Sequence, residues 1–311
     1  MSKLVKPKKI GKGSTLGIVG PSSPLPNIEK LDLTVRKLEQ LGYKVKLGDS
    51  TSRAYGYLAA TDDVRANDLN RMFADAEVDA VVAMRGGYGA MRILDKLDYS
   101  IARENPKVLI GFSDVTALHA AYMKYADLVA FHAPMPVGTL ADGEMEPIAQ
   151  DAFDRALKRA EPMGVVPSAF PLTALARGKA EGMLVGGNLC LQCGILGTPY
   201  ELDAKGCILF IEETGESVYS VDRLLTQLRL AGKFEDCAGI VIGDFDGCDA
   251  AMRGHNLTME QVLADILPKN KPIIRGYSIG HCTPNIALPL GVMARIDADN
   301  TELTILENAV I

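Results

Sequence analysis

The stretch VLIGFSDVTALHAA, residues Val108–Ala121, decides how this chain folds. A short apolar run ends at Gly111, a serine stands at Ser113, and a helical pattern begins with Asp114. An apolar run followed at once by a helix is typical of a buried parallel strand that turns sharply into the helix covering it. We therefore expect a strand–turn–helix unit that carries the Ser113 hydroxyl at its turn.

The same alternation extends outward through the first half of the chain. A parallel sheet covered by helices on both faces is the expected result, because strands that alternate with helices pair in parallel. We predict an α/β, doubly wound and mostly parallel domain over residues 1–160. Strands are expected at 16–21, 43–47, 78–84, 107–111 and 128–133, and helices at 27–41, 62–76, 113–125 and 145–160.

The rhythm changes after residue 160. Residues 161–176 contain three prolines and no clear period, which favours a linker. Residues 177–311 are expected to form a smaller, β-rich α+β domain. Strand patterns lie at 179–185, 207–212, 239–244, 272–277, 287–296 and 303–306, with helical patterns at 188–196, 220–231 and 258–267. The last two strands look like a hairpin turned at 298–300.

Composition narrows the classes of function. The chain has 311 residues, enough for two domains, and a net charge of −6. Phosphate binding needs concentrated positive charge, so an acidic chain without a basic cluster argues against a nucleic-acid partner. No apolar run reaches the length of a membrane span, and the N-terminus lacks the pattern of a secretory signal. We expect a cytoplasmic protein whose six cysteines, all in the second half, are reduced thiols.

Two turns at strand ends are candidate parts of a ligand site. Ser113 fits the strand–turn–helix context of a nucleophile, although GFSD is not the common GxSxG pattern and a helix N-cap is the simpler alternative. The turn Arg85–Gly89 (RGGYG) follows another buried strand, and its glycines allow close approach of backbone to a ligand. Ligands of doubly wound sheets bind at the carboxyl ends of strands, so both turns are expected to border one crevice.

The second half supplies an imidazole and a carboxylate. Among the four histidines, His281 follows an apolar strand in a turn and is the best general base. His119 is expected to pack inside a helix, His132 follows a strand, and His255 lies in a polar loop. The strand CILFIEE ends in two acids, Glu212 and Glu213, either of which can orient an imidazole or simply be solvated.

The pair Cys190 and Cys193 matches CxxC, a spacing found in redox and zinc sites. No second such pair or histidine pair follows at the spacing of a zinc site, and both cysteines fall on an apolar helical pattern. We interpret them as small core residues, and we expect neither a metal nor an organic cofactor.

Six segments, in order along nearly the whole chain, form a specific set. They are Gly20–Pro24 (GPSSP), Ala83–Gly89 (AMRGGYG), Leu109–Leu118 (LIGFSDVTAL), Gly186–Leu189 (GGNL), Leu209–Glu213 (LFIEE) with Tyr219 and Asp222–Leu225 (DRLL), and Gly280–His281. This set resembles the LD-carboxypeptidase family of serine peptidases, which also includes microcin-immunity peptidases.

The resemblance implies a Ser-His-Glu triad built from both domains. Ser113 takes the position of the nucleophile, His281 that of the base and Glu212 that of the acid, while the neighbouring Glu213 leaves the choice of glutamate open. The resemblance also implies an oxyanion hole made by the backbone N–H of Asp114 and of a glycine.

The remaining implied contacts lie in the glycine-rich turn. Gly86 and Gly87 are the glycines for the oxyanion hole. Arg85 and Tyr88 are the candidates for binding substrate, with Arg85 suited to a terminal carboxylate. We expect the site at the interface between the domains.

The family resemblance implies hydrolysis of the bond between an L-configured centre and a terminal D-alanine, as in murein tetrapeptides during cell-wall recycling. It also implies a small peptide as the partner and a homodimer. Two alternatives remain: a microcin-immunity type of peptidase acting on a peptidyl or aminoacyl nucleotide, and a non-catalytic muropeptide-binding protein. The absence of tryptophan makes the microcin-immunity alternative less favoured, because the nucleobase of such a substrate needs an apolar surface to pack against.

Overall fold

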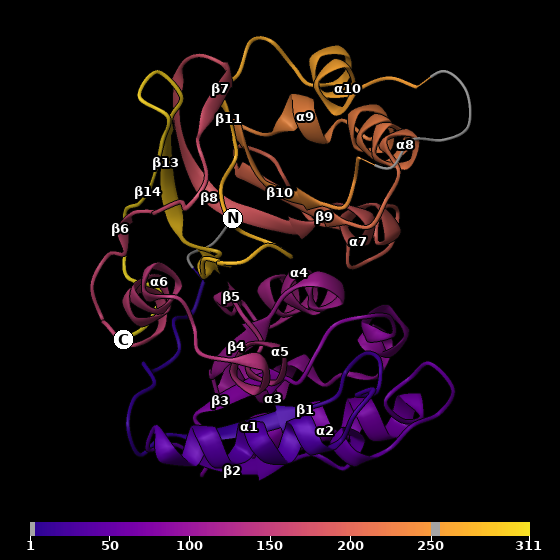
Figure 1. The fold of residues 1–311 in the computed structure, drawn as a ribbon, viewed down its shortest axis with the longest axis vertical. Coiled ribbons are helices and arrows are strands. Elements are labelled where there is room, and N and C mark those ends of the chain that lie inside the picture. Colours follow the sequence, from indigo (N-terminus) through magenta and orange to yellow (C-terminus); the bar gives the residue numbers. More distant parts are fainter. Residues whose placement is uncertain (1–3, 250–255) are drawn as a thin grey trace.

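The computed structural model describes residues 4–249 and 256–311, so His255 lies outside the described residues. Two layered units stack on each other along the long axis of the molecule (Figure 1). The N-terminal half of the chain builds one of them around a six-stranded sheet, the first domain. Most of the C-terminal half builds the other around an eight-stranded sheet, the second domain.

The sheet of the first domain has the order β12-β5-β4-β3-β1-β2. Its five N-terminal strands run parallel to one another, and the sixth, β12, is antiparallel at the edge beside β5. The mostly parallel sheet is confirmed. The strands are β1 (Thr15–Val19), β2 (Lys44–Leu47), β3 (Ala80–Ala83), β4 (Val108–Gly111), β5 (Ala130–His132) and β12 (Leu288–Leu290).

Helices cover both faces of this sheet because its central strands are apolar on both sides. In β3, Val82 belongs to the buried cluster that contains side chains of α1, α5 and α6, whereas Val81, on the opposite face, belongs to the cluster that contains side chains of α2, α3 and α4. The helices are α1 (Glu29–Gln40), α2 (Asp62–Ala74), α3 (Tyr99–Glu104), α4 (Thr116–Tyr125), α5 (Pro136–Asp142) and α6 (Pro147–Leu157), with 3-10 turns η1 (Asp49–Ser52), η2 (Ala90–Lys96) and η3 (Ser113–Val115).

The second sheet is mixed and has the order β6-β14-β13-β8-β9-β10-β11-β7. Its central strands β8 to β11 are parallel and its outer strands are antiparallel, which confirms a mixed second domain. The strands are β6 (Gly164–Val165), β7 (Thr173–Ala176), β8 (Lys179–Asn188), β9 (Ile208–Thr214), β10 (Gly239–Asp246), β11 (Ile273–Arg275), β13 (Met293–Asp297) and β14 (Glu302–Ile305). The helices are α7 (Leu189–Gly194), α8 (Val218–Leu230), α9 (Lys233–Asp236) and α10 (Met259–Ile266).

Two segments differ from the expectations. Residues 161–176, expected to be a linker, contribute β6 and β7 to opposite edges of the second sheet. Residues 287–296, expected to form one strand, divide into β12 in the first sheet and β13 in the second. The division falls at Gly291, whose φ of +85° breaks the extended backbone. The predicted hairpin is confirmed, because β13 pairs with β14 up to Asp297 and Glu302.

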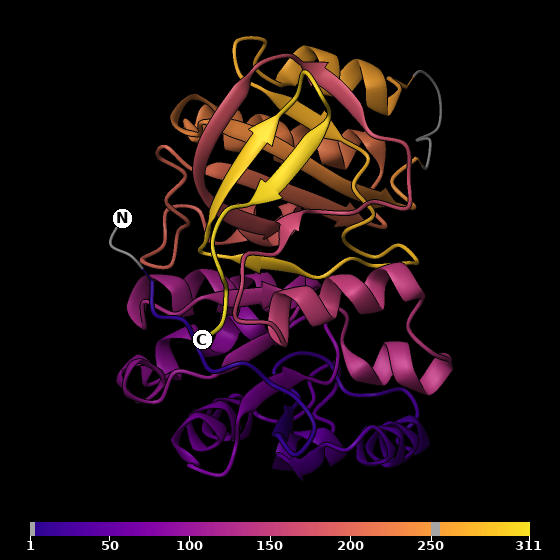
Figure 2. The same ribbon diagram turned by 90° about the vertical axis from the view of Figure 1, so that its left-hand side faces the viewer.

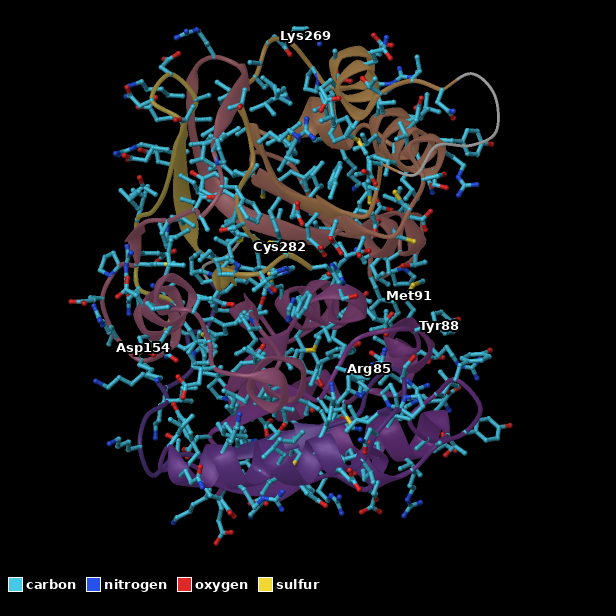
Figure 3. All side chains as sticks on the ribbon, in the orientation of Figure 1. Arg85, Tyr88, Met91, Asp154, Lys269 and Cys282 are labelled. Atoms are coloured by element: carbon cyan, nitrogen blue, oxygen red, sulfur yellow. The ribbon has the colours of Figure 1, made fainter. Side chains whose placement is uncertain are left out.

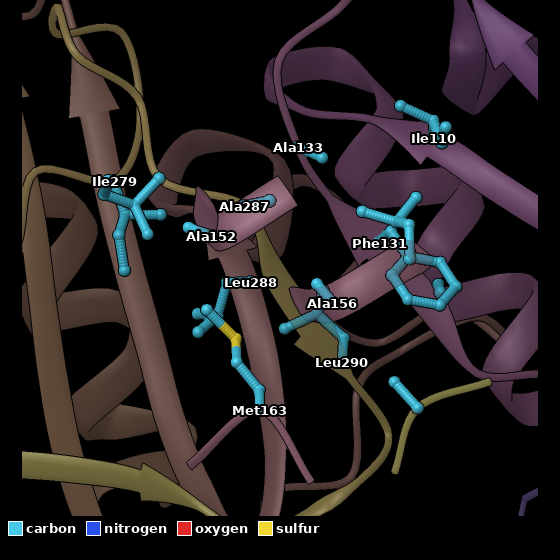
Figure 4. Close-up of a cluster of buried hydrophobic side chains, with 14 of the residues drawn as sticks. Ile110, Phe131, Ala133, Ala152, Ala156, Met163, Ile279, Ala287, Leu288 and Leu290 are labelled. Atoms are coloured by element: carbon cyan, nitrogen blue, oxygen red, sulfur yellow. The ribbon is translucent and has the colours of Figure 1, made fainter. Parts of the chain in front are cut away.

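One apolar core runs through both domains. Phe131 on β5 and Leu288 on β12 belong to the same buried cluster as Ile279 and Phe210 of the second domain. Figure 4 shows part of this cluster, and Figure 2 shows β12 lying along the boundary. Polar contacts add to it, since the Asn188 backbone N–H donates to the Thr116 hydroxyl at 2.9 Å. The two domains therefore present fixed surfaces to the site between them.

None of the helices in the described part of the chain combines the length and the apolar character that crossing a bilayer requires.

Candidate active site

Ser113 stands at the end of β4, where the chain turns into η3 and α4. Its φ is +63°, a region that residues other than glycine rarely adopt. Phe112 and Val115 occupy the N-cap positions of η3 and α4, and neither start has a side-chain capping bond. The capping role considered for Ser113 is therefore not observed. A strained serine at a strand-to-helix turn is instead the geometry of a nucleophile elbow.

The glycine turn, as we call Arg85–Gly89, lies directly against Ser113. A Cβ placed on Gly86 would approach the Ser113 hydroxyl to 3.1 Å and the Asp114 nitrogen to 3.6 Å, so only glycine fits here comfortably. Gly87 has a φ of +111°. The two turns predicted to border one crevice are thus in contact, and backbone N–H groups are available around the serine side chain.

His281, which is partly exposed, and the buried Glu212 form a hydrogen-bonded pair. His281 Nδ1 lies 2.8 Å from Glu212 Oε2, which leaves Nε2 on the other side of the ring. Glu212, in β9, is fully buried. A Cβ on Gly280 would lie 2.7 Å from the same carboxylate oxygen, so the glycine before the histidine makes room for the pair. Burial lowers the pKa of His281, but the hydrogen bond and charge of Glu212 outweigh it and raise the pKa above its usual 6.5.

Glu213 has other partners. Its carboxylate accepts from Asn188 Nδ2 at 2.8 Å and from the backbone N–H groups of Cys190 and Thr214 at 2.7 and 2.9 Å. Successive side chains of a strand point in opposite directions, so only one of the two glutamates can reach the imidazole. In this structure that residue is Glu212, while Glu213 fastens the start of α7 to the end of β9.

A cavity of about 360 Å³ opens beside His281 at the boundary of the two domains. Arg85 lies on its wall, and Figure 3 places Arg85 in the first domain and Cys282, the next residue after His281, near the second. Tyr88 does not line this cavity; it is 46% exposed, and its ring lies 5.9 Å from that of Tyr57. Other lining residues are Met84, Phe112, Pro134, Met135, Glu144, Met145, Glu146, Gly280, Thr283 and Asn285.

In the part of the chain that the structure describes, no hydrogen bond joins Ser113 of the first domain to His281, which follows a strand of the second. Their connection is Phe112, the residue before the serine, whose ring meets the His281 ring edge-on at a centroid distance of 5.0 Å. In enzymes of this kind the hydrogen bond between nucleophile and base is often long before substrate binds. The arrangement suits nucleophilic attack by Ser113 with His281 as its base.

The other two histidines that the structure describes, and Cys193 of the cysteine pair, take packing positions. His119 is fully buried in α4, as expected, and burial lowers its pKa to about 3. His132 is also buried, between the rings of Phe112 and Phe210, an environment that the sequence did not reveal. Cys193 is a core residue, whereas its partner Cys190 is only half-buried.

Comparison with known proteins identifies the family. The description "LD-carboxypeptidase N-terminal domain" matches residues 16–133, and "LD-carboxypeptidase C-terminal domain" matches residues 181–296. The chain belongs to the LD-carboxypeptidase family. Membership makes it a hydrolase, a serine peptidase of carboxypeptidase type, and argues against a non-catalytic binding protein.

Several relatives cover nearly the whole chain. The "Probable murein peptide carboxypeptidase" of Bacillus subtilis is 43% identical over 94% of this chain and 91% of its own. The solved muramoyltetrapeptide carboxypeptidase of Oxalobacter formigenes has a TM-score of 0.81 at 26% identity and covers 94% of this chain and 98% of its own. The wild-type structure of the microcin C7 self-immunity protein MccF has a TM-score of 0.89 at 26% identity, covering 99% and 100%.

Proposed function

We propose that this carboxypeptidase removes the terminal D-alanine from murein tetrapeptides through a triad of Ser113, His281 and Glu212. The observation that carries the proposal is the 2.8 Å contact between His281 and the buried Glu212, at a cavity that is lined by Phe112, the residue before Ser113. A buried carboxylate that accepts from Nδ1 fixes the tautomer in which Nε2 is free to take a proton. The names of the relatives support the same activity.

The mechanism follows from the chemistry of these groups. Nε2 of His281 takes the proton of the Ser113 hydroxyl as its oxygen attacks the carbonyl carbon of the scissile peptide bond. Glu212 stabilises the imidazolium that forms, and the N–H groups of Asp114 and of Gly86 or Gly87 stabilise the oxyanion. His281 then gives the proton to the leaving amine of D-alanine. Water, activated by the same imidazole, hydrolyses the acyl-enzyme and restores Ser113.

Arg85 gives this site its preference for a free C-terminus. The guanidinium lies on the cavity wall, and within the described residues its Nη1 donates to the Pro24 carbonyl at 2.9 Å. Its other N–H groups suit the carboxylate of the terminal residue, which an arginine can bind with two parallel hydrogen bonds. A carboxypeptidase needs such a group because it must distinguish a chain end from an internal peptide bond.

A peptidase of the microcin-immunity type is the second candidate. The TM-score of 0.89 with MccF favours it. Parallel assays with a murein tetrapeptide and with aspartyl sulfamoyl adenosine as substrates decide between the two candidate functions. We expect turnover of the tetrapeptide to exceed that of the nucleotide; the reverse order supports the second candidate.

Replacing Ser113 by alanine tests the proposal. Release of D-alanine from a murein tetrapeptide should fall to background while the free energy of unfolding stays near that of the wild type. The exposed Ser100, whose hydroxyl donates to Asp98 at the start of its own helix, provides the matched control, and Ser100→Ala should keep full activity. Turnover that survives in Ser113→Ala would refute the triad.

We also propose that the protein is a cytoplasmic homodimer. Sedimentation equilibrium tests the dimer. A mass close to the 33.3 kDa of one chain at all concentrations would contradict it.

A further inference from the structure

Arg65, on α2, is the largest fully buried side chain of the first domain outside the proposed site, and every part of its guanidinium is bonded. Nη1 donates to the carbonyls of Pro21 and Gly89, the latter at 2.8 Å. Nε donates to the Ala60 carbonyl at 3.2 Å, and Nη2 pairs with Asp62. A buried charge is costly unless all its donors are satisfied, so this environment is shaped for a guanidinium.

The Pro21 and Gly89 carbonyls belong to the turns that follow β1 and β3. Pro21 lies in the turn after β1, and Gly89 ends the glycine turn after β3. The turns also bond to each other, since Ser23 N–H donates to the Gly86 carbonyl at 3.4 Å and Tyr88 N–H donates to the Ser23 hydroxyl at 3.1 Å. The two turns are therefore linked twice, by these direct hydrogen bonds and by the Arg65 guanidinium that binds a carbonyl of each.

Asp114 holds the same turn from the other side. Its fully buried carboxylate accepts from the Ala90 backbone N–H at 2.8 Å. That N–H and the Gly89 carbonyl bound by Arg65 are the two polar ends of one peptide group. Arg65 and Asp114 thus bind the two polar ends of the same peptide group. Asp114 is also the residue that follows Ser113.

We propose that Arg65 and the Asp114 carboxylate are positioning residues that fix the Gly89–Ala90 peptide and thereby hold the glycine turn at the distance from Ser113 that an oxyanion hole requires. The inference rests on the proposed function, because it assigns the N–H groups of that turn to the oxyanion. Neither side chain touches substrate. Donors to an oxyanion must be held closely, since a displacement of about 1 Å can cost about 100-fold in rate.

Arg65→Lys tests this positioning role, because one ammonium group cannot bind the carbonyls of Pro21, Gly89 and Ala60 in the same geometry. We expect kcat for a murein tetrapeptide to fall about 10- to 100-fold with KM within two-fold, the signature of an interaction that acts only in the transition state. The inhibition constant of a peptidyl boronate, whose tetrahedral adduct places an oxygen in the oxyanion hole, should rise by the same factor. The dissociation constant of the product tripeptide should not change.

Arg71→Lys is the matched control. Arg71 lies on the same helix, is half-exposed, and pairs with Asp68 at 2.9 Å rather than with either turn. Its substitution should leave kcat and the boronate constant unchanged. A loss in Arg71→Lys equal to that in Arg65→Lys would assign the effect to the helix and overturn the inference.

Asp114→Ala supplies a second test that stands if Arg65→Lys does not fold. It removes the acceptor of the Ala90 N–H but keeps the backbone N–H of residue 114, and it should show the same kcat and boronate signature. Asp114→Asn should lose less, because its amide oxygen still accepts. Folded Arg65→Lys or Asp114→Ala protein with kcat and boronate inhibition within two-fold of the wild type would overturn the inference, whereas turnover in Ser113→Ala would overturn the proposed function instead.

Discussion

Replacing Glu212 by glutamine perturbs the proposed triad at its most enclosed point. The carboxylate is 0% exposed and lies 2.8 Å from His281 Nδ1, and a Cβ on Gly280 would lie only 2.7 Å from the same carboxylate oxygen. The amide has nearly the same shape, so the fold should survive. It removes the negative charge that stabilises the imidazolium, and its NH₂ group can hold the ring in the tautomer that protonates Nε2. Such a change in a serine triad lowers kcat about 10⁴-fold, or about 5 kcal/mol of transition-state stabilisation.

The pH dependence gives a sharper test than the rate. Two influences oppose each other at His281: burial lowers its pKa, and Glu212 raises it by a hydrogen bond and by charge. The net pKa lies above 6.5 in the wild type, so activity, which needs a neutral base, should fall as the pH drops through that value. In Glu212→Gln the two largest raising contributions to the His281 pKa, the hydrogen bond and the charge of Glu212, are lost while burial remains. The acid limb of kcat/KM should therefore move to lower pH.

The assay is D-alanine release from a murein tetrapeptide between pH 5 and 9, and the matched control is Glu213→Gln. Glu213 has a smaller raising effect on the His281 pKa and bonds to Asn188, Cys190 and Thr214 instead. Its variant should keep most of kcat and move the limb less. An acid limb that stays in place or moves to higher pH in Glu212→Gln would refute the reasoning, as would an equal shift in the control.

Three further predictions concern neighbouring positions. Gly86→Ala should lower kcat at least about 10-fold without unfolding the protein, because the new methyl group would lie about 3 Å from the Ser113 side chain; full activity with the fold intact would contradict the contact. Arg85→Met should raise KM for the tetrapeptide about 10- to 100-fold at similar kcat, because the substrate carboxylate loses one charged hydrogen-bonding partner. An unchanged KM would show that the carboxylate binds elsewhere. Burial lowers the pKa of His119 to about 3, so below pH 6.5 the unfolded chain binds a proton that the folded chain excludes, and stability falls as the pH drops. The free energy of unfolding, measured with urea, should therefore fall between pH 7 and pH 5 by about 2 kcal/mol less in His119→Leu than in the wild type. An equal fall in both proteins would show that His119 is not the cause.

Local sequence patterns predicted the five parallel strands of the first sheet well, because β1, β3, β4 and β5 are buried along their whole length and read as short apolar runs. The pattern around Val108–Ala121 gave both β4 and the start of α4. Periodicity could not predict β12, since Leu288–Leu290 reads as part of one apolar run that continues into β13. Which sheet a strand joins depends on contacts distant in sequence, and a single glycine at 291 redirects the chain.

The site shows the same division between local and distant information. Six short segments along the chain carried the family resemblance, which implied Ser113, His281 and Glu212 as the triad and left the choice between Glu212 and Glu213 open. The partners of Arg65 could not be foreseen. This arginine lies in a helix of ordinary amphipathic composition, and the two carbonyls that it joins come from turns more than 20 residues away on either side.

The central claim is that Ser113 is a nucleophile activated by His281 from the other domain. Mass spectrometry of the protein after treatment with a fluorophosphonate tests it most directly. The account predicts a single adduct on the peptide that contains Ser113, formed much more slowly in His281→Ala and absent in Ser113→Ala. An adduct on another residue, or labelling of Ser113 at an unchanged rate without the imidazole, would contradict it.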